Sequence, residues 1–282
     1  MTLETLPEIP SMAPLLVRAV ATARGRDGDA TPQTRLRVEG VRVEGGRLAA
    51  YQRLTGHAVQ DTLPQPYPWV LASPLQTALM VRPDFPLALP GIVHLENHVT
   101  THRRLDAGTP LDLEVAAGPV HGHRRGRTVG MHVEARVDDE LVWESRSVYL
   151  SRGRGSDDTE ATPGPPPVPG GPAVSLWDLP GDLGRRYAAV SGDVNPIHLH
   201  PLTARALGFR RHIAHGMWTS ARVLGALGRA SLGPSTSRVW FTRPLFLPAS
   251  VALVTRREQG RTVAAVTSAD GRTSHAVLSL EA

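Results

Sequence analysis

Two series of segments, each with the same order of helical and alternating patterns, follow one another along the chain. In each series, apolar positions at helical spacing predict two helices, and alternating apolar and polar positions then predict strands. The first series has predicted helices at 48–54 and 69–80 and predicted strands at 109–115, 128–137 and 141–150. The second has predicted helices at 183–190 and 215–229, a brief opening strand at 173–176, and later strands at 237–241, 250–256, 262–268 and 275–280. A long helix followed by consecutive antiparallel strands predicts an α+β fold in which the sheet wraps around the helix.

Residues 152–172 separate the two series. They read RGRGSDDTEATPGPPPVPGGP, a composition that builds no core and favours an extended, partly stiff spacer. The sequence therefore predicts a first domain at 1–151, a linker at 152–172 and a second domain at 173–282.

Two short strings indicate that the halves are distant copies of each other. Tyr51–Gly56 matches Tyr187–Gly192 in pattern, and Arg103–Thr109 parallels Arg243–Ala249. The strings keep their order and nearly the same separation, so we predict an internal duplication.

Composition excludes several kinds of chemistry. The chain has 282 residues and no cysteine, which excludes disulfides, thiolate metal sites and cysteine nucleophiles and fits a cytoplasmic protein. All 31 lysine-or-arginine positions are arginine, so lysine Schiff-base chemistry is excluded as well. The net charge of +5 is mild and the arginines are dispersed, which argues against a nucleic-acid partner. No secretory signal or apolar span is visible, so no membrane insertion is expected.

The segment 187–217 carries the candidate chemistry. In Ser191-Gly192-Asp193-Val194-Asn195-Pro196-Ile197-His198, Gly192 and Asn195 permit unusual backbone angles and Pro196 fixes its own φ. Pro196 also disfavours helix at Asn195, so we expect the chain to run extended toward His198. A bend of this kind can bring the acid and the base together. The structural alternative is that Asp193 caps a turn and His198 is a packing histidine.

A second string, Ala214-His215-Gly216-Met217, stands at the predicted start of the apolar helix. A glycine at a helix N-terminus exposes backbone N–H groups and the positive end of the helix dipole. Such donors can stabilise a thioester oxygen that develops negative charge. An acid, a base and an oxyanion donor in one short stretch favour the catalytic interpretation.

These strings resemble the signature of the MaoC-like, R-specific enoyl-thioester hydratase family. The residues that carry the resemblance are Tyr187, Ser191, Gly192, Asp193, Asn195, Pro196, His198 and the string Ala214 to Met217, which includes His215. The whole chain is similar to the actinobacterial double hot-dog 3-hydroxyacyl-thioester dehydratases. The resemblance implies two hot-dog domains that pair with each other. Whether such pairs form a homodimer stays open.

The resemblance also implies an activity and a set of roles. Asp193 and His198 would be the catalytic pair, and the Gly216 N–H would be the oxyanion donor. The implied substrates are enoyl thioesters of coenzyme A or of acyl carrier protein, hydrated reversibly to 3R-hydroxyacyl thioesters without a metal or an organic cofactor.

The first half departs from the family's pattern. His57-Ala58-Val59-Gln60-Asp61 follows Gly56, with neither the Asn-Pro pair nor a matching histidine, and we interpret this copy as catalytically inactive. In the resembling enzymes such a copy completes the acyl pocket. We therefore expect Trp69, Ala72 and Ala78 of the first apolar helix to contact the acyl chain.

Three alternatives remain. His198, His200, His212 and His215 have spacings that could bind zinc, although His200 should point away from His198 in an extended stretch. A thioesterase of the same fold would direct water at the carbonyl carbon. A non-catalytic module that binds acyl thioesters is the third.

Overall fold

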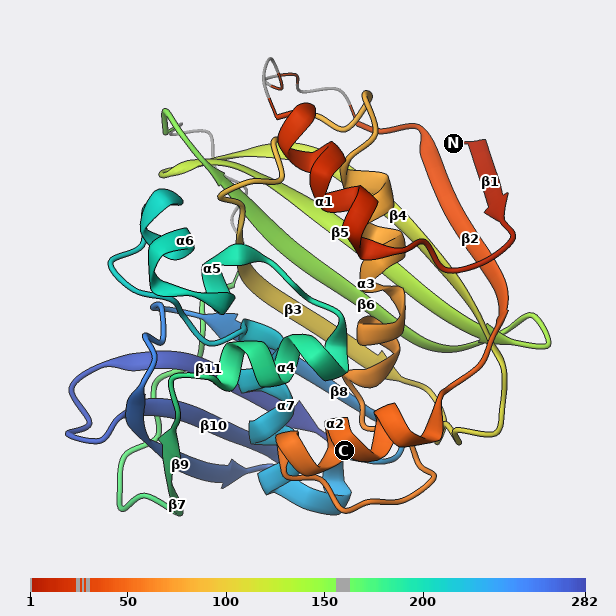
Figure 1. Cartoon of the computed structure of the whole chain (residues 1–282). Helices are drawn as coiled ribbons and strands as arrows, with labels where there is room; N and C mark the ends of the chain where they lie inside the picture. The colour runs from red at the N-terminus through yellow and green to blue at the C-terminus, as the bar shows by residue number, and fades with distance from the viewer. Residues whose placement is uncertain (1, 24–25, 27, 29–30, 156–162) are drawn as a thin grey trace. The chain divides into compact units, whose positions relative to one another are not determined.

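The structure of the chain, a computed structural model, describes residues 2–23, 26, 28, 31–155 and 163–282 (Figure 1). The chain divides into two compact units. The first unit comprises Met1–Val43, Pro68–Asn97 and Gly108–Pro163, and the second comprises Glu44–Tyr67, His98–Ala107 and Gly164–Ala282.

These units do not coincide with the two halves of the sequence. Residues 44–67 and 98–107 precede the predicted linker, yet they pack within the second unit. The Leu63 N–H donates to the Leu105 carbonyl at 2.9 Å and joins the two segments to each other, and Trp218 Nε1 donates to the Leu54 carbonyl at 3.3 Å and joins the first of them to α7 (Gly216–Leu227). Packing therefore groups the chain differently from the predicted domains 1–151 and 173–282, which stay a prediction. Of the predicted linker 152–172, residues 156–162 lie outside the described residues.

The first unit is built on one sheet with the strand order β1-β2-β4-β5-β6-β3. Its elements are β1 (Thr2–Leu6), α1 (Met12–Ala21), β2 (Thr34–Val41), α3 (Tyr67–Met80), β4 (Leu111–His123), β5 (Gly126–Val137), β6 (Glu140–Arg152) and the part of β3 (Val93–Thr101) that ends at Asn97. Strand β1 is parallel to β2, whereas β2–β4, β4–β5 and β5–β6 are antiparallel. Helix α3 lies against this sheet (Figure 1) and buries Leu75 and Leu79 completely. Apolar burial of this kind is the main stabilising contribution to the unit.

The strands of the second unit are antiparallel and follow the order β8-β11-β10-β9-β7. Its strands are β7 (Ser175–Leu179), β8 (Ser235–Phe241), β9 (Ala249–Glu258), β10 (Arg261–Ser268) and β11 (Ser274–Glu281). Its helices are α2 (Gly45–Thr55), α4 (Leu183–Ser191), α5 (Pro196–Leu199), α6 (Pro201–Ala206), α7 (Gly216–Leu227) and the 3₁₀ turn η1 (Gly228–Ser231). Helix α7 packs against β10 and β11, and Ala221 and Leu224 on it are fully buried. This is the predicted α+β arrangement.

All of the predicted helices and strands are present, and most differ from the prediction by a few residues at their ends. Strand β4 is the main exception, because it continues to His123 where an end near residue 115 was expected. The register shifts between Ala117 and Val120, so Gly118 and Pro119 occupy a bulge within the strand instead of ending it. The sequence pattern does not predict β1, α1, β2, β3 or the short helices α5 and α6. No helix in the described part of the chain is long and apolar enough to cross a membrane.

Helices α2 and α4 share a local geometry that supports the internal duplication. In α2 the Thr55 hydroxyl donates to the Tyr51 carbonyl at 2.8 Å, and in α4 the Ser191 hydroxyl donates to the Tyr187 carbonyl at the same distance. Each helix then ends on a glycine with positive φ, 76° at Gly56 and 78° at Gly192. Two copies of one supersecondary unit would keep such a detail.

Candidate active site

The candidate acid, Asp193, follows directly on the end of α4. Gly192 adopts φ 78°, a left-handed conformation that glycine enters without steric cost, and this turns the chain out of the helix. The Asp193 N–H donates to the Ser191 hydroxyl at 3.1 Å, and Asp193 Oδ1 accepts from the Asn195 N–H at 3.2 Å. The Asp193 side chain is 26% exposed. Its carboxylate is therefore held by a short local network and remains accessible.

The candidate base, His198, lies on the single helical turn α5, and the predicted extended approach to it is wrong. Asn195 is extended, with ψ 124°, but its side chain then caps α5 by accepting from the Ile197 N–H at 3.3 Å. Pro196 occupies the first helical position, where its missing N–H costs nothing and its fixed φ suits the helix. The Asn-Pro pair therefore starts a helix, and this helix directs His198 toward Asp193.

The His198 ring is buried and fixed in one tautomer. Its Nδ1 lies 2.8 Å from the Ile213 carbonyl oxygen, which can only accept, so Nδ1 carries the proton. Burial, together with the neighbouring His215, lowers the pKa of His198 to about 3. At neutral pH the imidazole is therefore uncharged, and Nε2 presents a lone pair that can accept a proton.

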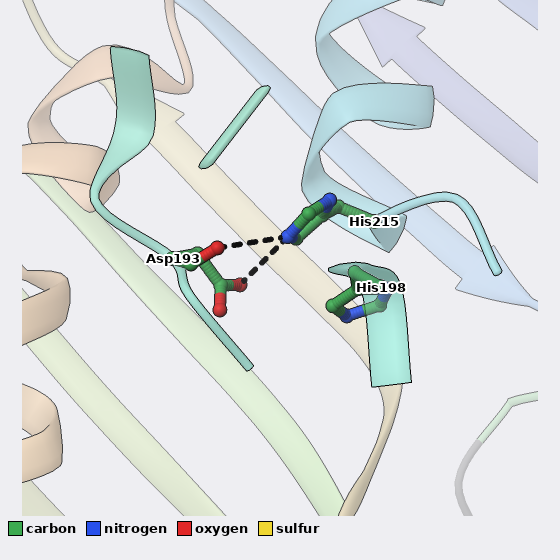
Figure 2. A group of neighbouring side chains, drawn as sticks. All are labelled: Asp193, His198 and His215. Atoms are coloured by element: carbon green, nitrogen blue, oxygen red, sulfur yellow. Dashed lines mark hydrogen bonds and ion pairs between the residues drawn. The ribbon is translucent and has the colours of Figure 1, made fainter. Parts of the chain in front are cut away.

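His215 lies in contact with Asp193 and His198. From the sequence it is expected only to be a supporting residue. Figure 2 shows it reaching Asp193: His215 Nε2 donates to the Asp193 backbone carbonyl at 3.0 Å and lies 3.9 Å from Oδ2. Its ring stacks on that of His198 with centroids 3.7 Å apart, and the Tyr187 ring lies 4.8 Å away. Burial lowers the pKa of His215, so the stacked pair is neutral. His215 thus contacts both candidate catalytic groups.

Helix α7 begins beside this cluster, with His215 at its N-cap and Gly216 as its first residue. A Cβ on Gly216 would lie 2.9 Å from the Phe241 ring, so a larger residue would force the helix start or the ring to move. The first N–H groups of an α-helix have no partner inside the helix. The Gly216 N–H is therefore a free donor by position, while its role as oxyanion donor stays a prediction.

Asp193, His198 and His215 form the group of potential metal ligands in the described chain, with ligand atoms within 4.8 Å of one another. Their geometry does not suit one ion. Each imidazole donates through one nitrogen and keeps the other free, but the two rings are stacked, with centroids 3.7 Å apart at an interplanar angle of 27°. In stacked rings the free lone pairs lie nearly side by side, whereas one ion would need both to point at it at roughly 2.1 Å. The zinc set considered from the sequence is not assembled either. Exposed His200 caps α6 by accepting from the Leu202 N–H, and His212 Nε2 lies 2.7 Å from the Gly181 carbonyl.

The first copy has the same helix end as the second, followed by different side chains. His57 follows Gly56 at the position that Asp193 occupies after Gly192, and Thr62 stands where the second copy has His198. His57 is buried, and burial lowers its pKa to about 4. This position thus holds a neutral imidazole in place of a carboxylate. That the copy is inactive stays a prediction.

Arg47 is a further residue at the site that the sequence did not reveal. It lies on α2, in the first half of the sequence, but it packs in the second unit. Its Nε donates to the Val190 carbonyl at 2.7 Å, and its Nη2 lies 3.0 Å from the point where a Cβ on Gly192 would stand. Contacts to backbone atoms leave no pattern in a sequence. Tyr51, whose ring lies 6.1 Å from that of Tyr187, is the one neighbour that the matched strings could have suggested.

The three residues expected to contact the acyl chain lie on α3 in the first unit. Trp69 and Ala72 are buried, and Trp69 Nε1 donates to the Ser147 hydroxyl at 3.1 Å. Ala78 is half-buried. Their role toward an acyl chain stays a prediction.

The sequence matches a known family and a curated relative. Residues 180–277 match the family described as MaoC like domain. The chain is 34% identical over 235 residues to the 3-hydroxyacyl-thioester dehydratase X of Mycobacterium tuberculosis, covering 82% of this chain and 83% of that protein. The crystal structure of HtdX from M. tuberculosis matches with a TM-score of 0.78 and 28% identity over 88% of this chain and 99% of that chain.

A more distant structure shows the fold alone. The MaoC-like dehydratase from Phytophthora capsici matches with a TM-score of 0.72 at 17% identity, over 90% of this chain and 96% of that chain. These likenesses confirm the predicted double hot-dog fold.

Proposed function

Because the chain belongs to the MaoC-like dehydratase family, we propose that it catalyses the reversible hydration of trans-2-enoyl thioesters to (3R)-3-hydroxyacyl thioesters. One structural observation supports this chemistry: Asp193, His198 and His215 lie together beside the N-terminus of α7. The carrier would be coenzyme A or acyl carrier protein. We propose that the reaction needs no metal or organic cofactor and takes place in the cytoplasm.

The tautomer of His198 suggests how the two catalytic groups divide the work. Because Nδ1 donates to Ile213, Nε2 takes a proton from a water molecule whose other hydrogen is held by the Asp193 carboxylate. The water oxygen forms a bond to C3, and the electron pair of the double bond moves onto the thioester as an enolate. The imidazolium then returns the proton to C2, so one water is added and no proton is gained or lost.

Two groups would stabilise the charges that arise in this sequence. The Asp193 carboxylate favours the imidazolium that forms at His198, as the direction of its influence on the His198 pKa requires. The Gly216 N–H, at the positive end of α7, would donate to the enolate oxygen. Because the oxygen and the proton come from the same side, addition would be syn.

A direct assay separates this function from the alternatives. The purified protein is incubated with crotonyl-CoA, and loss of the enoyl absorbance, formation of the 3R product by chiral chromatography and release of free thiol are followed together. Hydration without thiol release is expected. Thiol release in place of hydration would identify a thioesterase, and no reaction at all would favour a non-catalytic binding module.

We also propose that α3 contacts the acyl chain. Ala78 is the better position for a test than Ala72, because Ala72 is fully buried and a bulky residue there would overpack the core. Ala78→Leu should lower kcat/KM for long enoyl chains relative to crotonyl-CoA. An unchanged preference for chain length would contradict this contact.

A further inference from the structure

The segment of the chain that follows Asp193 carries charge of one sign. Between Asp193 and Glu258 the chain contains nine arginines and no aspartate or glutamate. This stretch includes α5, α6, α7 and β8, so the elements that follow Asp193 supply cations and no carboxylate of their own. The whole chain is far more balanced, with a net charge of +5. The imbalance is therefore local to the part of the second unit that carries the site.

Two of these arginines lie over one aromatic ring, and a third is hydrogen-bonded to the backbone of one of them. The Cζ atoms of Arg210 and Arg211 lie 4.3 and 6.0 Å from the centroid of Phe246, and Arg205 Nε donates to the Arg210 carbonyl at 3.2 Å. We call Arg205, Arg210 and Arg211 the arginine cluster. All three side chains are exposed, and none makes an ion pair with any residue that the structure describes.

The arginine cluster is joined directly to the site. Arg211 stands two residues before Ile213, which places their Cα atoms at most about 7.6 Å apart. Ile213 accepts the hydrogen bond that fixes His198, and it forms an antiparallel bridge with Phe246. Phe246, whose ring contacts the guanidinium groups, is therefore paired with Ile213, the residue that orients His198.

The guanidinium groups of the arginine cluster repel one another at this separation. An anion bound between them would replace that repulsion with attraction to each group. Arginine is also the side chain best suited to phosphate, because its planar N–H fork donates two hydrogen bonds to phosphate oxygens. Stacking on Phe246 uses the face of a guanidinium and leaves its N–H edge free. A merely solvated arginine, such as exposed Arg257 on β9, has no such ring beneath it.

We propose that the arginine cluster binds a phosphate of the substrate's carrier. The proposal rests on the proposed function, because an enoyl thioester presents its reacting carbons at one end of a pantetheine arm and a phosphate at the other. Coenzyme A and acyl carrier protein share the 4′-phosphate of that arm, whereas the 3′-phosphate and the adenosine belong to coenzyme A alone. Binding at the cluster would hold the arm while the enoyl end reaches His198.

The test compares three thioesters with the same crotonyl-pantetheine end: crotonyl-pantetheine has no phosphate, crotonyl-4′-phosphopantetheine adds the 4′-phosphate, and crotonyl-CoA adds the whole nucleotide. Initial rates are measured for the wild type and for an Arg210→Ala/Arg211→Ala variant. Arg257→Ala is the control, because it removes an exposed cation from the same unit. Thermal unfolding is recorded for each protein. The matching lysine variant keeps the charge and tests whether a cation alone restores binding.

For the wild type we expect a higher kcat/KM with the phosphorylated substrates than with crotonyl-pantetheine. The double alanine variant should raise KM for a phosphorylated substrate by about 10- to 100-fold, the range of a lost charge-assisted hydrogen bond. Its kcat, and its kcat/KM with crotonyl-pantetheine, should change little. A loss with both phosphorylated substrates assigns the site to the shared 4′-phosphate, and a loss with crotonyl-CoA alone assigns it to the nucleotide phosphates.

The proposal is overturned if the alanine variant treats the three substrates as the wild type does, or if Arg257→Ala produces an equal loss. Failure of the proposed function looks different, because the wild type would then hydrate none of the three thioesters.

Discussion

Gly192→Ala tests whether the turn after α4 places Asp193 for catalysis. Gly192 has φ 78°, and a side chain in this left-handed conformation costs about 1–2 kcal/mol. Its Cβ would also stand 3.0 Å from Arg47 Nη2. Arg47 has little freedom to withdraw, because its Nε is bound to the Val190 carbonyl at 2.7 Å. The substitution should therefore lower the free energy of unfolding by about 1–2 kcal/mol and shift the turn at the same time.

The effect on turnover should exceed the effect on stability. Asp193 is the next residue, and a misplacement of about 1 Å in a catalytic group can reduce the rate by ~100-fold. We expect kcat for crotonyl-CoA hydration to fall by about 10- to 100-fold, with little change in KM. Urea denaturation measures the stability, and initial rates measured well below the unfolding transition give the activity.

Gly260→Ala is the matched control. Gly260 has φ 81°, almost the same as Gly192, but nothing lies within 4 Å of its added Cβ. This variant should lose a similar 1–2 kcal/mol of stability and keep normal turnover. If Gly192→Ala retains wild-type kcat, or if Gly260→Ala loses as much, the turn does not position the acid.

Further outcomes are expected from the site and from the units. Asp193→Asn and His198→Ala should each reduce turnover at least ~100-fold without unfolding, and the double variant should lose little more, since both act on one water; fully additive losses would contradict this shared step. His57→Ala should leave turnover nearly unchanged in steady-state assays, and a large loss in a folded variant would mean that the first copy takes part. Because burial lowers the pKa of His198 from 6.5 to about 3, the unfolded chain binds a proton there that the folded chain does not. The free energy of unfolding should therefore fall as the pH drops from about 6.5 toward 3, and urea titrations at pH 7 and 5 should show a weaker fall for His198→Ala. Residues 173–282 expressed alone should be insoluble or inactive, because they lack the segments 44–67 and 98–107 of their own unit; a soluble fragment with full activity would refute this.

Local chemistry explains why the sequence identified so much of the site. Asp193 and His198 are five residues apart, and the residues between them follow short-range rules: a glycine ends one helix, and an Asn-Pro pair begins the next. The expectation that the proline keeps the chain extended is wrong, because Pro196 occupies the first position of α5, where proline suits a helix. The prediction that acid and base converge nevertheless held, because either conformation turns the chain back within a few residues.

The sequence by itself determined the α+β class, the internal repeat, most of the helices and strands, and the candidate catalytic pair. These depend on periodicity and on neighbours in the chain, which a sequence displays directly. Only the tertiary structure decided that His215 stacks on His198 and reaches Asp193, that Arg47 supports the turn, and that residues 44–67 pack in the second unit. Such contacts join residues 17 to 143 positions apart through ring faces and backbone carbonyls. Every residue has a carbonyl, so no side-chain pattern in the sequence marks which one will be used.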